Sequence, residues 1–553
     1  MMMMELPEAL KNPRELYARV ESEPFPRSIT ALMQGVVEKY PDRPALRFID
    51  GSPTLTYAQL DDVVARLAGG LRTMGVELGA RVAVLMPNKP AYPITYLAAA
   101  RLGVTIVPLN VSLTPRELAY ALNDAGATYT IVDGPLLDTL RQALPDIPKL
   151  SEERIIVVGA ESGSLTSWER LAQAEPFRGD DGHFTTPLTI QYTSGTTGLP
   201  KGAMQTQEFW MCIGMAQSAE LKYLDVQNIL VVHSFYYMDA LWELMMAFCL
   251  NGTIVLAPRM SASNYMAWVR EYDIHYALVT PHIYKQPESP LDGQHKLRLL
   301  QTYGFSKDLH AAFEERFKVP VRETFGMTEV GAGAFVPVVA EDKTGSGAVG
   351  IPAPYRRLKI VDDNGAEVPD GEIGELWVTG RGLFLGYNNM PEATEAIFKD
   401  GWVRSGDLFR RDADGFYYIV GRMKDMVRRN MENISAREVE DILISHPAIA
   451  NAAVIGVPDA AKTEEVLALI VLRDGQEVSP QDLYAYCQDR LAKFKWPRYF
   501  GYRDAFPLTP SAKVAKHEIK KATPDLLAGA YDVQEETWIT AGGGLTTKAP
   551  ISA

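Results

Sequence analysis

Short apolar runs rich in β-branched residues alternate with helical patterns between about residues 28 and 335. These runs read as strands and begin at Arg81, Tyr129, Arg154, Asn228, Gly252 and Tyr276. Strands that are apolar on both faces need helices on both sides of the sheet, as in mainly parallel sheets. The alternation therefore predicts an α/β fold. The apolar segment 241–258 reads as a core helix followed by a strand, because Glu243, Asn251 and Gly252 interrupt it.

The pattern of strand-like and helical segments changes after about residue 350. Strand-like segments there are separated by the turn-forming stretches DDNG and PDGEIG, which predicts a small antiparallel β unit. Two helical and two strand-like segments follow residue 421 and indicate a compact α+β domain. We predict a large N-terminal domain of helix-covered, mainly parallel sheets with the β unit (1–421), a small mobile C-terminal domain (422–530) and a flexible tail (531–553).

The overall composition narrows the classes of function. The chain has 553 residues, 47% of them hydrophobic, and its net charge of −14 argues against a broad nucleic-acid surface or binding to anionic membranes. Cys212, Cys249 and Cys487 are too far apart for a disulfide framework or a zinc site. The first residues are acidic where a secretory signal is basic. We expect a cytoplasmic enzyme with no nucleic-acid or membrane partner. The sequence leaves open whether the chain forms a homo-oligomer.

The segment QYTSGTTGLPKGA at 191–203 is rich in glycine and hydroxyl groups and has little apolar surface to bury. Glycine permits positive φ, so that backbone amides and hydroxyls can converge on an anion. The segment does not match the phosphate-loop template, because Pro200 precedes Lys201 and Gly202 follows it. Its composition alone is compatible with a phosphate site and with an ordinary surface loop.

Further motifs follow this segment in order: ETFGMTE at 323–329, RSGDLFRRDADGFYYIVGRMKDMVRR at 404–429 and PLTPSAKVAKHEIKK at 507–521. Together, over about residues 28–525, the motifs resemble the adenylate-forming (ANL) superfamily of acyl-CoA synthetases, peptide-synthetase adenylation domains and firefly luciferase. The resemblance implies an enzyme that activates a carboxylic acid with ATP as acyl-AMP and releases pyrophosphate. Because this reaction needs no protein nucleophile, we expect residues that position the reactants and neutralise charge.

The resemblance implies a nucleotide site assembled from several motifs. Its members are Thr193, Ser194, Gly195, Thr196, Thr197, Gly198, Lys201, Thr324, Phe325, Gly326, Asp407 and Arg422. The loop residues would grip the β- and γ-phosphates. Phe325 would stack on adenine, where relatives usually have Tyr, and Asp407 would bond the ribose hydroxyls. Arg422 opens the hinge motif.

The catalytic residues that the resemblance implies are Lys201, Thr328, Glu329 and Lys513. Thr328 would contact the α-phosphate, and Glu329 would hold Mg²⁺ through a hard carboxylate oxygen. Lys513, on the small domain, would reach the α-phosphate and the attacking carboxylate. Ala512 precedes it where relatives usually have Gly. The implied cofactors are ATP, Mg²⁺ and coenzyme A as co-substrate.

The resemblance also implies a small domain that rotates between the two half-reactions. Lys424 matches the pivot residue of the hinge. Met431 stands where relatives have Gly, in a segment near the acyl centre and the pantetheine channel. Its side chain would narrow the path of the thiol or change how the rotated domain docks. One alternative is an enzyme that passes the acyl group to a carrier-protein thiol or an amine in trans. Another is a degenerate nucleotide-binding regulatory protein, against which the intact catalytic residues argue.

The segment VVHSFYYMDALWELMMAF at 231–248 matches the family's acyl-pocket region. Tyr236 stands where many relatives have His, and the pattern resembles the crotonobetaine/carnitine-CoA ligase branch, which implies a small acid. The pocket residues are His233, Tyr236, Tyr237, Asp239, Trp242, Tyr303, Gly304 and Phe305. The aromatic members and Asp239 suit a cage for a cation, or the aromatics are ordinary core. Bulk in TYGFSKD at 302–308 predicts a compact carboxylic acid.

Overall fold

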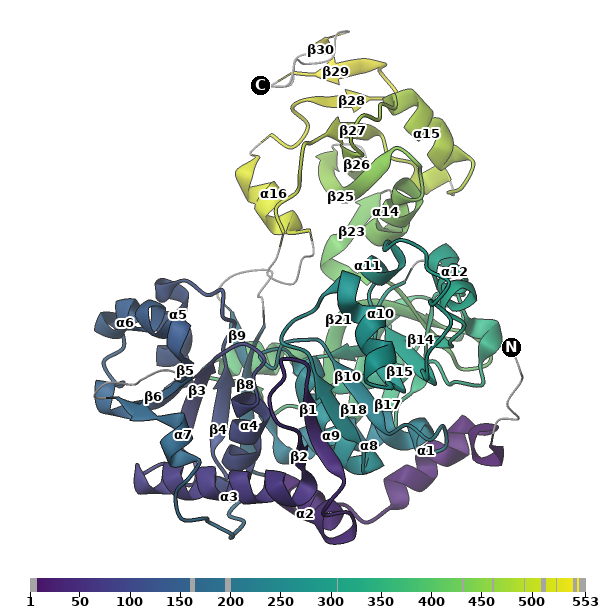
Figure 1. Ribbon diagram of the computed structural model, residues 1–553. Helices are drawn as coiled ribbons and strands as arrows, with labels where there is room; N and C mark the ends of the chain where they lie inside the picture. Colours follow the sequence, from purple (N-terminus) through teal and green to yellow (C-terminus); the bar gives the residue numbers. More distant parts are fainter. Residues whose placement is uncertain are drawn as a thin grey trace.

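A computed structural model describes residues 7–159, 165–193, 200–305, 307–429, 432–459, 462–491, 493–508, 514–523, 525–540 and 545–546. The chain forms a large body of two sheets with helices against them, and a smaller unit with a third sheet lies at the C-terminal end of the colour ramp, at the top of Figure 1. This arrangement confirms the predicted fold class. The boundary at residues 421 and 422 and the mobility of the small unit stay predictions.

The predicted loop joins two strands near one edge of the first sheet. Its order is β19 (Gly386–Tyr387), β9 (Lys201–Thr206), β8 (Pro187–Thr193), β4 (Thr105–Pro108), β3 (Arg81–Leu85), β5 (Tyr129–Asp133), β6 (Ile155–Val158) and β7 (Thr166–Ser167). The strands from β8 to β7 pair in parallel, whereas β8, β9 and β19 pair antiparallel. The middle strands are buried on both faces, which is why the sequence shows them as continuous apolar runs.

The second sheet combines the rest of the parallel strands with the β unit. Its order is β17 (Arg356–Val361), β18 (Gly374–Gly380), β21 (Trp402–Arg411), β22 (Tyr417–Arg422), β16 (Ala348–Pro352), β15 (Gly331–Phe335), β14 (Val321–Met327), β13 (Leu299–Thr302), β12 (Tyr276–Leu278), β10 (Asn228–Val231), β11 (Thr253–Leu256), β1 (Pro44–Phe48) and β2 (Leu55–Thr56); β20 (Phe398–Lys399) pairs with β21. Pairing changes from parallel to antiparallel at β14, so the antiparallel β unit predicted after residue 350 continues this sheet.

Helices cover the sheets of the large body. They are α1 (Pro13–Ser22), α2 (Ile29–Lys39), α3 (Tyr57–Thr73), α4 (Ala91–Leu102), α5 (Pro115–Ala125), α6 (Leu137–Ala143), α7 (Trp168–Leu171), α8 (Gln207–Leu221), α9 (Met238–Leu250), α10 (Ala262–Glu271), α11 (Pro281–Tyr284), α12 (Lys307–Phe317) and α13 (Pro391–Ile397). α8 and α9 pack closely at Gly214, where a Cβ would lie 2.6 Å from the Cβ of Met245. None of the helices in the described part of the chain combines the length and the apolar character that a membrane span requires.

The small unit has a sheet in the order β24 (Glu432–Ser435), β23 (Met426–Arg429), β26 (Thr463–Leu472), β27 (Tyr499–Tyr502), β28 (Ala530–Asp532), β29 (Thr537–Ile539) and β30 (Leu545–Thr546), with β25 (Ile449–Asp459) on β26. Its helices are α14 (Ala436–Ile444), α15 (Pro480–Gln488) and α16 (Lys516–Ala522). Residues 531, 532 and 537–539, which the sequence placed in a flexible tail, instead lie in β28 and β29 of the sheet. Backbone pairing supplies the order that the side-chain pattern did not reveal.

Candidate functional site

The predicted phosphate loop is a hairpin connection whose two ends lie together. β8 and β9 pair antiparallel so that Thr193 lies opposite Lys201, and the Thr193 hydroxyl is 3.4 Å from the Lys201 carbonyl oxygen. Gly202 needs to be glycine, because a Cβ there would lie 2.7 Å from Cγ2 of Ile190. The predicted loop residues Ser194, Gly195, Thr196, Thr197 and Gly198 lie outside the described residues.

A buried tyrosine joins Glu329 to the lysine of the loop. The hydroxyl of Tyr387 donates to Oε1 of Glu329 at 2.6 Å, and Nζ of Lys201 lies 5.0 Å from the centroid of the Tyr387 ring. β19 carries Tyr387 and pairs with β9 directly after Lys201. Burial, followed by the neighbouring Glu329 charge, raises the pKa of Tyr387, so its hydroxyl stays a donor. The sequence analysis missed Tyr387, because only the pairing of β19 with β9 brings it here.

The turn between β14 and β15 carries Thr328 and Glu329. Side-chain and backbone bonds hold this turn from two sides. Nε2 of Gln205, on β9, donates to the Thr328 carbonyl at 2.8 Å, and the amide of Phe384 donates to the Glu329 carbonyl at 3.0 Å. The structure thus brings Lys201, Thr328 and Glu329 to one place, and their catalytic roles stay predictions.

The predicted adenine residues lie on β14 before this turn. The ring of Phe325 is 8% exposed and packs edge-on against Phe409, with centroids 5.0 Å apart. The Thr324 hydroxyl donates to the Ala334 carbonyl at 3.2 Å. Gly326 faces the backbone of the next strand so closely that a Cβ would lie 2.6 Å from a carbonyl oxygen. These contacts fix the strand, and stacking of Phe325 on adenine stays a prediction.

Asp407, the predicted ribose ligand, forms an ion pair with Arg422, which opens the hinge motif. Asp407 on β21 and Arg422 on β22 are register partners, and Nε of Arg422 lies 2.9 Å from Oδ1 of Asp407. The carboxylate is buried, whereas half of the arginine side chain is exposed. Glu375, which the sequence analysis missed, accepts from the amide of Gly406 at 3.1 Å and from the Trp377 indole at 2.8 Å. It therefore holds β21 in place directly before Asp407.

In the predicted acyl segment, the turn after β10 is held by Asn88, which follows β3, and by Gln191 on β8. Asn88 donates to the His233 carbonyl at 2.9 Å and accepts from the Phe235 amide at 3.0 Å. Nε2 of Gln191 donates to the Tyr236 carbonyl at 2.6 Å. Since Gln191 lies on β8, this bond connects the acyl segment to the strand that leads into the phosphate loop. Asn88 and Gln191 had no signal in the sequence that pointed to these roles.

The predicted aromatic cage is only partly assembled. The rings of Tyr236 and Tyr237 have centroids 4.8 Å apart, and the hydroxyl of Tyr303 is 3.5 Å from Oδ1 of Asp239. Trp242 is 3% exposed and belongs to the hydrophobic core of the large body. The structure therefore supports core packing for Trp242.

One turn beyond Asp239 on α9, Glu243 is fully buried. Neither of its carboxylate oxygens has a hydrogen-bond partner among the residues that the structure describes. Burial, with a smaller contribution from the Asp239 charge, raises the pKa of Glu243. Two acids therefore follow one another along this side of α9, and the sequence analysis had treated Glu243 only as an interruption of an apolar helix.

The loop that follows β13 is attached to a second buried acid. Glu323, the first residue of ETFGMTE, accepts from the amides of Gly304 and Phe305, each at 2.8 Å. Gly304 has φ +73°, a conformation that side chains other than glycine rarely adopt. Phe305 is buried and packs against Phe313, so it supports the loop from the core side.

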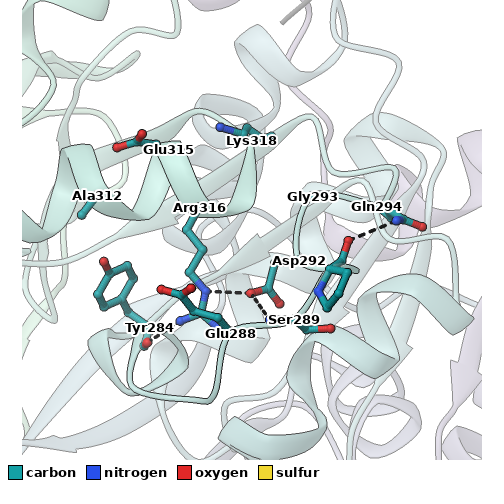
Figure 2. Close-up of a pocket in the computed structure, with 11 residues that line it drawn as sticks. Tyr284, Glu288, Ser289, Asp292, Gly293, Gln294, Ala312, Glu315, Arg316 and Lys318 are labelled. Atoms are coloured by element: carbon teal, nitrogen blue, oxygen red, sulfur yellow. Dashed lines mark hydrogen bonds and ion pairs between the residues drawn. The ribbon is translucent and has the colours of Figure 1, made fainter.

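A surface depression of about 600 Å³ lies apart from all predicted site residues, between α11, α12 and the segment that joins α11 to β13 (Figure 2). Its central side chain, Arg316, donates to Asp292 at 2.7 Å, to the carbonyls of Tyr284 and Gln286 at 2.7 and 3.0 Å, and to that of Pro287 at 2.9 Å. These bonds use its guanidinium to hold the loop, so the depression is better explained by loop structure than by ligand binding.

Some predicted residues cannot be placed. Lys513 and Met431 lie outside the described residues, and for Lys424 only the backbone is described. That backbone lies in a single 3₁₀ turn, η6 (Met423–Asp425), between β22 and β23. The predicted pivot thus falls at a junction between an element of the large body and one of the small unit.

Comparisons with known proteins cover both parts of the chain. The family model described as AMP-binding enzyme matches residues 33–388, and that described as AMP-binding enzyme C-terminal domain matches residues 438–513. A feruloyl-CoA synthase from an Amycolatopsis species is 33% identical over 480 residues, which cover 85% of this chain and 94% of that protein. A crotonobetaine/carnitine–CoA ligase from Proteus mirabilis is 30% identical over 486 residues, 84% of this chain and 93% of that protein. The solved structure of ATP-bound MatB from Rhodopseudomonas palustris aligns with a TM-score of 0.80 and 25% identity, over 90% of this chain and 99% of that chain.

Proposed function

This chain belongs to the family of AMP-binding enzymes as an AMP-forming acid–thiol ligase, and we propose that it joins a small carboxylic acid to coenzyme A through an acyl-AMP. Its similarity to crotonobetaine/carnitine–CoA ligases agrees with the resemblance predicted from the motifs. The observation that carries the proposal is the contact of Tyr387 with both Glu329 and Lys201 beside the loop hairpin.

The first half-reaction requires charge neutralisation around ATP. The carboxylate of the acid attacks the α-phosphorus, the bond to the bridging oxygen breaks, and pyrophosphate leaves with the negative charge. Lys201 supplies a cation at the base of the β8–β9 hairpin, where the phosphates would lie. The Asp407 carboxylate, presented by β21, would accept from the ribose hydroxyls.

The carboxylate of Glu329 suits Mg²⁺, which takes oxygen ligands and is commonly held by one or two carboxylates together with substrate phosphates. Within the described part of the chain, no three His, Cys, Asp or Glu side chains gather as a metal site, so the phosphates would complete the ligand set. When bound, Mg²⁺ would offset phosphate charge. Tyr387 orients the Glu329 carboxylate by donating to one of its oxygens.

In the second half-reaction the thiol of coenzyme A attacks the acyl carbonyl, and AMP leaves. We propose that the small unit rotates at Lys424 between the two steps, because the pivot lies in the 3₁₀ turn between β22 and β23. Lys513 would serve the first step and withdraw for the second. Met431 would then lie near the path of the thiol.

The acid is proposed to be compact. Tyr236, Tyr237 and Tyr303 supply bulk, and the loop of Tyr303 is held by Glu323. Asp239 and Glu243 place two acidic side chains on α9, and Tyr303 contacts the first of them. The Asp239 carboxylate disfavours a second carboxylate on the substrate, since a like charge in a partly buried site is costly. Glu243 adds no such charge, because burial raises its pKa and favours the protonated form.

Pyrophosphate release over a panel of small acids, with and without coenzyme A, tests the proposal. We expect release that depends on ATP, Mg²⁺ and an acid, and a thioester when coenzyme A is added. The panel should pair each compact monocarboxylic acid with a long-chain acid and a dicarboxylic acid of similar size. Release without any acid, or an acyl-AMP that never gives a thioester with coenzyme A, would contradict the proposed ligase.

A further inference from the structure

Glu323 connects two segments that line the proposed substrate site. It lies on β14, two residues before Phe325, and it is 5% exposed. Each of its hydrogen bonds to the loop after β13, from the amides of Gly304 and Phe305, uses a different carboxylate oxygen. An ionised carboxylate offers two acceptor oxygens, whereas a protonated one turns one of them into a hydroxyl. The attachment of this loop is therefore strongest when Glu323 carries its charge.

A charged group of the small unit lies on the same loop. Nη2 of Arg437, at the start of α14, is 3.5 Å from the position that a Cβ on Gly304 would occupy. Nε of Arg437 is also within 3.8 Å of Oδ2 of Asp441 on its own helix, and 42% of its side chain is exposed. The guanidinium thus spans from α14 to the loop of the large body.

The charge of Arg437 acts on Glu323. Burial raises the pKa of Glu323 to about 7, and the two amide bonds and the Arg437 charge oppose this rise. A carboxyl group with this pKa changes its protonation under ordinary cellular conditions when a nearby positive charge arrives or leaves. The register partner of Glu323 on β13 is Thr302, which carries no charge.

We propose that Glu323 is a positioning residue that couples the docking of the small unit to the attachment of the acyl-site loop, residues 302–305. With Arg437 over Gly304, the charged form of Glu323 is favoured, and this form holds both amides of the loop. When α14 moves away, Glu323 takes up a proton and the loop loosens. The functional role of this coupling rests on the proposed two-step ligase, because the small unit changes its position only in that mechanism. The contact itself does not depend on the identity of the acid.

Amide hydrogen exchange of segment 302–305 tests the coupling without any substrate. Protection, corrected for the intrinsic rate, should fall in the wild type as the pH drops through about 7. In Arg437→Gln the midpoint should shift to higher pH, because an opposite charge is lost. Arg490→Gln is the matched control: Arg490 belongs to the same unit, is also 42% exposed and stacks on Tyr486. It should leave the midpoint unchanged.

Glu323→Gln completes the test, since its amide cannot titrate. We expect this variant to lose the pH-dependent step and to raise the KM for the acid roughly tenfold with a smaller change in kcat. The coupling is refuted if Arg437→Gln keeps the wild-type midpoint, or if Glu323→Gln keeps the step. Should Glu323→Gln fail to fold, the surface variant alone decides. If no acid of the panel releases pyrophosphate but Arg437→Gln still shifts the midpoint of exchange, the proposed function is overturned and the coupling between Arg437 and Glu323 is retained.

Discussion

At the scale of single residues, the site depends on how one side chain orients another. Tyr387 touches Glu329 and Lys201, although it belongs to no motif that the sequence displays. Glu323 plays the same kind of part for a loop, and Glu375 for the strand β21. These residues act on backbone amides or on a neighbouring acid, so their role is invisible until the strands are assembled.

Tyr387→Phe should therefore lower kcat for pyrophosphate release by about tenfold, because a hydrogen bond to a charged group contributes about 1.5–3 kcal/mol. Initial rates at saturating ATP measure this effect, and the midpoint of thermal unfolding shows whether the variant is folded. Tyr418→Phe is the matched control, since its hydroxyl donates to the carboxylate of Asp412 at 2.9 Å in the β unit. Equal losses in both variants would show that the Tyr387 contact is only structural.

At the scale of elements, the start of α14 is joined to the large body by its own cap. The Ser435 hydroxyl accepts from the Glu438 amide at 3.3 Å and donates to the Val420 carbonyl on β22. Gly421 leaves room for this hydroxyl, since a Cβ there would lie 2.7 Å from it. A single side chain thus begins a helix of the small unit and holds it on a strand of the large body.

Ser435→Ala should cost about 1 kcal/mol of unfolding free energy as a lost helix cap, and it should also increase proteolysis near the junction of β22 and β23. Ser479→Ala removes the corresponding cap of α15, whose hydroxyl accepts from the Asp482 amide at 3.1 Å. We expect this control to lose similar stability without new cleavage at the junction. Cleavage that rises equally in both variants would argue against a joining role for Ser435.

At the scale of the whole molecule, the proposed rotation of the small unit would separate the two half-reactions. Lys513→Ala should abolish most acyl-AMP formation, because the resemblance to the family assigns this lysine to the α-phosphate. Thioester formation from supplied acyl-AMP should remain within a factor of a few of the wild type. Rapid-quench assays of each step measure the two rates separately. A parallel loss of both steps would speak against the alternation of the small unit.

The order of elements was largely predictable from the sequence, because strands buried on both faces must be apolar throughout. The strands that begin near Arg81, Tyr129 and Asn228 appear as β3, β5 and β10. The end of the chain was not predictable in this way. β28 is held by backbone pairing on β27 and β29 by pairing on β28, and such short strands leave little pattern in their side chains.

The sequence by itself determined the chemistry: hydroxyls and glycines before Lys201, an acid at 329 and another at 407, in an order typical of AMP-binding enzymes. Only the tertiary structure decided which groups orient them. Tyr387 reaches Glu329 because β19 pairs with β9, and Glu323 reaches Gly304 because β14 lies beside β13. The physical reason is that a hydrogen bond needs its two atoms within about 3 Å, and strand pairing sets that distance between residues far apart in the chain.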